Sequence, residues 1–349
     1  MKVLFLTLYP EVAASPRYRV AQFVPHLRNA GIQCTVAAAV SPEQYARLTG
    51  PNRVARPLWY HLAETRRRLG QLLGARGFDV VFVQKSLMSA YLRGMLHLLR
   101  MCARRVVYDL DDAVHLQPPH PLRGIWRAVE DHRQAARLLA AADLVLAGNE
   151  WLVAQASNLG ATAVHFPTVV DTERFHPPAE SPLEFRIGWI GNPSTTPSLE
   201  VLGKDFPEAA DSEIRLIGAD PARSPWPRAA IEPWSLDSEV AALQQFAVGL
   251  MPLPKDEWSR GKCALKALQY MACGVPCVAT PFGAVLDIIR DGENGLFADS
   301  PEAWQDAVRR LRDPALRRRL AEAGRATVEA RFALDQAAPR MRELLESVA

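Results

Sequence analysis

A chain of 349 residues is longer than a single hydrophobic core usually becomes, so we expect two domains. Apolar residues make up 49% of the chain and charged residues 23%, which is typical of a globular protein of enzyme size. A net charge of only +3 does not indicate nucleic-acid binding, which would require a clustered basic face with stacking aromatics. Five cysteines without CxxC spacing argue against a disulfide framework or a zinc site and favour the reducing cytoplasm.

The N-terminal sequence MKVLFLTLYP could be mistaken for a secretion signal, but its apolar run is shorter than a signal requires. The run predicts a first buried strand at 3–8. A helix is expected over about 16–30, with Ser15 as its cap and Pro16 in its first turn, and a strand over 34–40 follows. This strand–helix–strand order is Rossmann-like, although no G-x-G-x-x-G fingerprint for a dinucleotide is present. No run approaches the ~20 apolar residues of a membrane span.

Strands and helices continue to alternate along the rest of the chain. In the first half we expect strands at 79–84, 105–110, 144–147 and 163–166, and helices at 41–76, 86–101, 122–141 and 150–159. The proline-bearing stretch 166–182 has the composition of a linker. In the second half we expect strands at 186–190, 213–217, 248–253 and 277–279, and helices at 302–311, 315–330 and 335–347. The pattern predicts two doubly wound α/β domains that bind ligands at the carboxyl ends of their strands.

The segment SRGKCALKALQYMACGVPCVATP (259–281) carries the clearest site signal. Its apolar spacing predicts a helix that a Gly-x-Pro sequence terminates, followed by a short buried strand. Arg260, Lys262 and Lys266 gather at the start of that helix, where cations oppose the helix dipole. Free amides and three cations at a helix N-terminus form a receptor for a phosphate or diphosphate. A solvated charged face is the alternative.

Six segments together resemble the retaining, nucleotide-sugar-dependent glycosyltransferases of family 4, which have the GT-B fold. They are SPRYRVAQFVPHLRNAG (15–31), VVYDLDD (106–112), FPTVVDTERFHP (166–177), IGWIGNPST (187–195), GLMPLPKDEWSRGKCALKALQYMACGVPCVATPFG (249–283) and DGENGLFA (291–298). The sequences YMACGVPCVAT and DGENGLF are the most specific, because they recur together at this separation.

The resemblance implies two Rossmann-like domains that face a cleft. Residues 1–167 would present the acceptor, 168–334 would hold a nucleoside diphosphate sugar, and a last helix in 335–349 would cross back to the N-terminal domain. The implied reaction moves a sugar with retention of configuration and without a metal or other cofactor. The acceptor could be a glycan, a lipid-linked molecule or a small molecule. We expect the enzyme in the cytoplasm or peripheral to the inner membrane, with no nucleic-acid partner.

Two departures from the family pattern affect the donor site. The usual Glu-x7-Glu pair is replaced by Gly261 and Gln269. Gln269 can still hydrogen-bond a ribose through its amide, whereas Gly261 offers no side chain. The Arg and Lys that often follow the first strand of the second domain are also missing, and Lys262 and Lys266 would supply those cations. A non-catalytic GT-B module that binds a nucleotide or a partner is therefore the alternative to an enzyme.

Two turns complete the predicted donor site. Gly191 and Asn192 follow a strand tightly enough for their backbone amides to approach a phosphate, and a plain turn is the alternative. Phe282 and Gly283 follow the last strand of the 259–281 segment and are expected to line the sugar pocket.

Asp111 and Asp112 are the candidate catalytic residues, because they stand with Asp109 at the carboxyl end of a strand. They fall where related enzymes often have a His-Asp pair. One carboxylate would orient an acceptor hydroxyl or stabilise positive charge at the anomeric carbon. A DxD metal site is one alternative, although the GT-B fold does not need that metal. Capping of the following turn is the other.

Two basic regions remain in the N-terminal half. Arg17 and Arg19 follow the first strand and are expected to hold a phosphate or an acidic acceptor, the alternative being an exposed first helical turn. The arginine-rich region 47–76 suggests an enzyme that meets anionic lipid at a membrane face, and a solvated amphipathic helix is its plainer interpretation.

Overall fold

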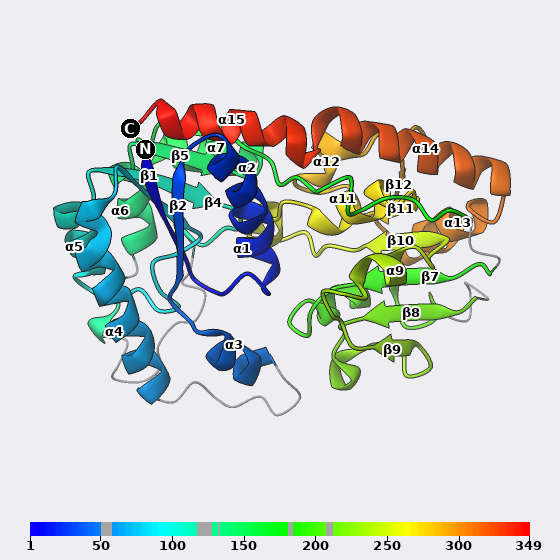
Figure 1. The fold of residues 1–349 in the computed structure, drawn as a ribbon. Coiled ribbons are helices and arrows are strands. Elements are labelled where there is room, and N and C mark those ends of the chain that lie inside the picture. Colours follow the sequence, from blue (N-terminus) through cyan, green and yellow to red (C-terminus); the bar gives the residue numbers. More distant parts are fainter. Residues whose placement is uncertain (50–57, 117–127, 132, 181–183, 207–211) are drawn as a thin grey trace. The chain divides into compact units, whose positions relative to one another are not determined.

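A computed structural model describes residues 1–49, 58–116, 128–131, 133–180, 184–206 and 212–349. The chain divides into two compact units, one formed by Met1–Thr168 with Ala337–Ala349 and the other by Val169–Gln336. Each unit contains one six-stranded parallel sheet with helices packed around it (Figure 1). No helix in the described part of the chain is long and apolar enough to cross a membrane.

The first sheet has the strand order β2-β1-β3-β4-β5-β6. Its strands are β1 (Lys2–Thr7), β2 (Gln33–Ala38), β3 (Val80–Gln84), β4 (Arg105–Leu110), β5 (Leu144–Ala147) and β6 (Ala163–His165). The central strands are almost wholly buried, as expected of parallel strands that helices cover on both faces. The chain leaves β1 toward β2 on one side and returns as β3 on the other. The topological switch point therefore lies between β1 and β3, where ligands usually bind in such sheets.

The helices of the first unit are shorter than the sequence predicts. They are α1 (Ala14–Arg19), α2 (Val24–Asn29), α3 (Pro42–Thr49), α4 (Leu58–Gly74), α5 (Met95–Cys102), α6 (Gln134–Ala141) and α7 (Glu150–Asn158). The single helix predicted over 16–30 is wrong, because the backbone of Val20 leaves the helical region and Pro25 starts a new helix. Parts of the helices predicted at 41–76 and 122–141 lie outside the described residues.

The second sheet has the order β12-β11-β10-β7-β8-β9. Its strands are β7 (Ile187–Ile190), β8 (Ile214–Ile217), β9 (Ala230–Glu232), β10 (Val248–Met251), β11 (Cys277–Ala279) and β12 (Leu296–Phe297). Its helices are α9 (Glu239–Leu243), α10 (Glu257–Arg260), α11 (Leu265–Ala272), α12 (Val285–Ile288), α13 (Pro301–Arg310) and α14 (Pro314–Arg331). Helix α15 (Leu334–Glu346) continues into the residues that belong to the first unit. The switch point of this sheet lies between β7 and β10.

The core of the second unit holds α11 firmly against the switch point. The Tyr270 hydroxyl of α11 donates to the Leu250 carbonyl at 3.2 Å and accepts from the Ile190 amide at 2.9 Å, so it joins β10 and β7. A Cβ on Gly249 would lie 2.4 Å from the Tyr270 ring, so only glycine allows this approach. The start of α11 is thereby fixed beside the carboxyl ends of β7 and β10.

The described part of the stretch predicted as a linker is packed and ordered. Val170 pairs with Ala333, and Phe175 is buried. The Arg325 guanidinium donates to the carbonyls of Thr172 and Phe175, which ties this stretch to α14. The boundary between the two units, Thr168–Val169, lies inside the predicted linker, and the described residues after it pack onto the second unit. The last residues of the stretch lie outside the described part.

Candidate functional site

The 259–281 segment folds differently from its sequence prediction at one point. The predicted continuous helix is broken into α10 and α11, and Ala264 between them has a left-handed backbone with φ of 53°. A left-handed backbone in a non-glycine residue costs about 1–2 kcal/mol and is held only where its surroundings impose it. The break leaves Lys262 in the connection and Lys266 in the first turn of α11. No side chain caps the N-terminus of α11.

Lys266 is the most perturbed cation of the predicted donor site. Its side chain is half-buried, and its Nζ atom lies 4.2 Å from the ring centroid of Trp189 on β7. Burial lowers the pKa of Lys266 to about 7, and the nearby positive charge of Lys262 adds to this effect. Contact with an aromatic face replaces only part of the hydration that an ammonium group loses on burial. An anion placed here would favour the protonated form of Lys266.

Lys262 and Arg260 also lie against aromatic rings. The Nζ of Lys262 is 5.5 Å from the centroid of Trp258, and the guanidinium carbon of Arg260 is 5.4 Å from that of Phe282. Gly283 has φ of +62°, and a Cβ there would approach the Arg260 carbonyl to 3.1 Å. The structure thus brings Arg260, Phe282 and Gly283 together, and their contact with a donor stays a prediction.

The polar groups of the turn after β7 are mostly used in hydrogen bonds within the turn and to strand β8. The Gly191 amide donates to the Ile217 carbonyl at 2.9 Å, so the predicted contact of this amide with a phosphate is not available. Gly191 instead makes room for Trp189, whose ring a Cβ would approach to 2.2 Å. The Asn192 side-chain oxygen accepts from the amides of Ser194 and Thr195. This is the plain turn that the sequence left as an alternative.

Gln269 has an interior partner that the sequence did not reveal. Its side chain is buried, and its Nε2 donates to Oε1 of Glu239 on α9 at 3.0 Å. Glu239 also accepts from Trp234 and Arg174. A glutamate at 269 would place a second carboxylate against buried Glu239, which explains the amide at this position. The ribose contact of Gln269 stays a prediction.

A polar network occupies the switch point of the first sheet. Asp111 accepts hydrogen bonds from the Ser15 hydroxyl and, at 3.3 Å, from Nε2 of Gln84. The same Gln84 nitrogen lies 2.6 Å from the Ser15 hydroxyl oxygen. The prediction of Ser15 as a helix cap is therefore wrong, because Ala13 occupies the cap position and the hydroxyl serves Asp111. Three segments, after β1, at the end of β3 and after β4, thus converge on one carboxylate.

Lys85 completes this network and was missed by the sequence analysis. Its ammonium group pairs with Asp112. Burial works against its charge, but the carboxylates of Asp112 and Asp111 outweigh burial and raise the pKa of Lys85 well above its ordinary value. Its backbone is left-handed with φ of 64° and is held by hydrogen bonds with Asp109 and Tyr108. The only sequence signal was the pair Gln84–Lys85 directly after a buried strand.

The structure contradicts the ligand role predicted for Arg19, and it places Arg17 in a largely buried position. Arg19 is buried, donates from Nε to the Asp109 carboxylate at 3.0 Å and from Nη1 to the Phe166 carbonyl at 2.8 Å. It is therefore an interior residue and not a phosphate or acceptor ligand. The pairing also removes Asp109 from any DxD metal site. Arg17 is largely buried, with its Nη1 3.2 Å from the Val12 carbonyl.

Replacing Arg19 by methionine is expected to destabilise the protein by about 3–5 kcal/mol, because it leaves the Asp109 charge buried without its partner. Burial already raises the pKa of Asp109 to about 6 with Arg19 present. The free energy of unfolding in urea measures the effect. The exposed pair Arg105–Asp143 is the control, and Arg105→Met should cost no more than about 1 kcal/mol. Equal losses in the two variants would contradict the interior role of Arg19.

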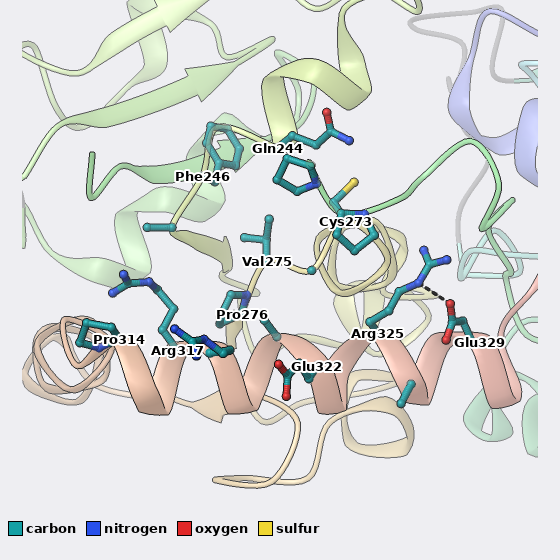
Figure 2. Close-up of a pocket in the computed structure, with 17 residues that line it drawn as sticks. Gln244, Phe246, Cys273, Val275, Pro276, Pro314, Arg317, Glu322, Arg325 and Glu329 are labelled. Atoms are coloured by element: carbon teal, nitrogen blue, oxygen red, sulfur yellow. Dashed lines mark hydrogen bonds and ion pairs between the residues drawn. The ribbon is translucent and has the colours of Figure 1, made fainter. Parts of the chain in front are cut away.

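A cavity of about 460 Å³ lies in the second unit at the amino ends of β10 and β11 (Figure 2). Phe246, Val275 and Pro276 form its apolar wall. Two of its arginines have structural partners, since Arg325 donates to Glu329 and the Ala272 carbonyl, and Arg317 donates to the Leu311 carbonyl. None of the predicted donor-binding residues lines this cavity. We therefore place the candidate site at the carboxyl ends of β7 and β10.

Comparison with solved structures decides the fold family. HepE of Anabaena in complex with UDP superposes with a TM-score of 0.71 at 15% identity, over 99% of this chain and 100% of that chain. Sucrose-phosphate synthase of Thermosynechococcus elongatus gives 0.72 at 18% identity, over 99% and 98%. The chain has the GT-B fold. The expectation from the sequence is confirmed at this level.

The matches found by sequence cover only part of this chain. Residues 184–313 match the family model described as glycosyl transferases group 1. The D-inositol 3-phosphate glycosyltransferase of Nocardioides sp. is 32% identical over 135 residues, which is 38% of this chain and 27% of that protein. The match thus spans about a quarter of that relative. The residues matched by the family model, 184–313, include the segment that carries the candidate donor site.

Proposed function

We propose that this protein is a glycosyltransferase that moves a sugar from a nucleoside diphosphate sugar to an acceptor with retention of configuration. The observation that carries the proposal is Lys266, a half-buried cation on the Trp189 face at the start of α11. Its pKa reflects burial and the positive charge of Lys262. Such a position favours a ligand that brings its own negative charge. HepE was solved with UDP and with UDP-glucose, which supports a nucleotide-sugar donor.

The proposed chemistry is stabilisation of the leaving group. Cleavage of the bond between the anomeric carbon and the diphosphate leaves negative charge on the departing oxygen. Lys262, Lys266 and the amides of α11 are proposed to stabilise that charge in fixed positions. Neither a metal nor a cofactor has a part in this proposal.

The first unit is proposed to hold the acceptor, whether glycan, lipid-linked or small molecule. Asp111, positioned by Ser15 and Gln84, would orient the acceptor hydroxyl or stabilise positive charge at the anomeric carbon. Asp112, paired with Lys85, would support Asp111 in this role. The polar network holds Asp111 from three segments, and such positioning is what an oriented reaction requires.

Release of nucleoside diphosphate from a panel of nucleotide sugars tests the activity, with and without candidate acceptors. We expect release from at least one donor and faster release with an acceptor of the correct class. The anomeric configuration of the product, read by NMR, tests retention. A nucleotide that binds in calorimetry while no donor is turned over would favour a non-catalytic module. The comparisons do not favour that alternative, since the curated relative is itself named a glycosyltransferase.

Binding of UDP is expected to weaken as the pH rises above about 7. The free Lys266 amine loses its proton near this pH, whereas a bound diphosphate favours the ammonium form and raises its pKa. The association constant should therefore fall by up to about tenfold per pH unit until the pKa of the bound state is reached. Calorimetry from pH 6 to 9, in buffers of different ionisation enthalpy, measures the affinity and the proton uptake. A flat affinity without proton uptake would contradict the assignment.

A further inference from the structure

The buried face of helix α4 (Leu58–Gly74) holds two charged residues between Tyr60 and Leu72, whereas its exposed face carries large apolar residues. Glu64 and Arg68 are fully buried, whereas Trp59 is 48%, Leu62 61%, Leu69 36% and Leu73 61% exposed. An ordinary surface helix shows the reverse arrangement. The exposed apolar residues therefore need an explanation outside the core of the unit.

Hydrogen bonds fix this orientation of α4. The Arg68 guanidinium donates to the carbonyls of Leu87 and Thr7, both at 2.6 Å. The Glu64 carboxylate accepts from the backbone and side chain of Ser89. Rotating α4 to bury Leu62, Leu69 and Leu73 would separate Glu64 and Arg68 from these hydrogen-bond partners. Leaving the two charges without partners would cost a large amount of folding free energy. The apolar residues are thus held toward solvent.

The exposed apolar residues of α4 form one continuous row. With Arg66 among them they are spaced by three and four residues, and they fall within about a quarter of the helix circumference. We call Trp59, Leu62, Arg66, Leu69 and Leu73 the α4 stripe. Single exposed leucines are normal on a protein surface, but an aligned row of large apolar side chains marks an interaction surface.

The exposed charge on α4 and α5 is positive, since Arg66 and Arg100 are exposed and neither helix has an exposed carboxylate. The only acidic residue of α4 is buried Glu64, and α5, which packs against α4, contains none. Arg66 on α4 and His97, Arg100 and Met101 on α5 are exposed. Exposed tryptophan, leucine and arginine side chains, on two helices that have no exposed carboxylate, suit a partner with a negatively charged surface over an apolar interior.

We propose that the α4 stripe binds the surface of an anionic lipid bilayer. Trp59 and the leucines enter the boundary between headgroups and acyl chains, where an amphipathic helix lies in the plane of the membrane. Arg66 on α4 and Arg100 on the neighbouring α5 remain at the level of the lipid phosphates, which attract each positive charge near the surface. A second copy of this chain would bring two positive faces together, so charge complementarity favours lipid. The proposal does not depend on the glycosyltransferase activity.

Sedimentation of the full-length protein with vesicles tests this proposal. We expect it to sediment with phosphatidylglycerol–phosphatidylcholine vesicles and much less with phosphatidylcholine alone, and salt should weaken the binding. The double variant Leu62→Gln/Leu73→Gln should bind anionic vesicles at least about tenfold more weakly, because two apolar side chains no longer enter the bilayer. Leu286→Gln is the control, because Leu286 is 54% exposed on α12 in the second unit. It should bind as the unchanged protein does.

Two further measurements keep the outcome unambiguous. Unchanged urea unfolding of the double variant shows that it remains folded. A blue shift of tryptophan fluorescence on vesicle addition, lost in Trp59→Phe, places the α4 stripe itself in the bilayer. The proposal is overturned if the unchanged protein ignores anionic vesicles or if the double variant sediments equally well. It is also overturned if the stripe instead forms a dimer that Leu62→Gln/Leu73→Gln dissociates in sedimentation velocity.

Discussion

Replacement of Lys266 by methionine is expected to weaken UDP binding by about 10- to 100-fold, the loss of one hydrogen bond to a charged group. Methionine retains an apolar stem of similar length beside Trp189, so the packing at the start of α11 should survive. Calorimetry at pH 6.5, where most of the Lys266 amine is protonated, should give the largest difference in UDP affinity between the variant and the unchanged protein. At pH 9 this difference in affinity should become smaller, because a neutral amine offers the diphosphate little more than methionine does.

Lys255→Met is the matched control for this experiment. Lys255 is an exposed lysine of the same unit that pairs with Asp299, so its replacement removes the same formal charge without changing a residue of α11 or its contact with Trp189. We expect its affinity for UDP to stay within about twofold of the unchanged protein, since exposed pairs contribute little. If Lys266→Met binds UDP as tightly as Lys255→Met does, the diphosphate is not at Lys266.

Asp111→Asn is expected to lower kcat by about 10²- to 10³-fold, the usual loss when a group that stabilises charge in the transition state is removed. Asparagine has nearly the same shape and can still accept from Ser15, so the network should keep its geometry. The affinity for UDP should not change, because the proposed donor site lies in the second unit. Steady-state kinetics with the identified donor, together with UDP calorimetry, separates the two effects.

The choice of Asp111 over Asp112 follows from the structure. Removing the Asp112 charge would leave Lys85 without its paired carboxylate and would mix a stability loss into the kinetics. Asp299→Asn is the control, since Asp299 is an exposed carboxylate outside the network. A kcat of Asp111→Asn within twofold of that control would remove Asp111 from the proposed chemistry.

Much of the sheet structure could be predicted because parallel strands covered on both faces are continuous apolar runs. The strands at 105–110, 144–147 and 277–279 have the predicted bounds. The very short β9 and β12 were missed, since two or three residues carry no periodic signal. The break before α11 was also invisible. The apolar spacing of α11 begins at Leu265, and the left-handed backbone of Ala264 leaves no mark in the pattern of side chains.

The candidate site was predictable only where its residues are near one another in the sequence. The cations around 260–266 and the carboxylates at 111–112 belong to such local groups. The partner of Arg19 lies 90 residues away and that of Gln269 lies 30 residues away. Pairing at these separations depends on which strands become neighbours, so a sequence pattern could not show that Arg19 is an interior residue.

The structure of the protein bound to UDP tests the central claim most directly. We expect the diphosphate at the start of α11, with the Lys266 ammonium displaced from the Trp189 ring to a phosphate oxygen and Lys262 close by. Diphosphate bound instead in the cavity at the amino ends of β10 and β11, beside Arg317 and Arg325, would contradict the proposed donor site.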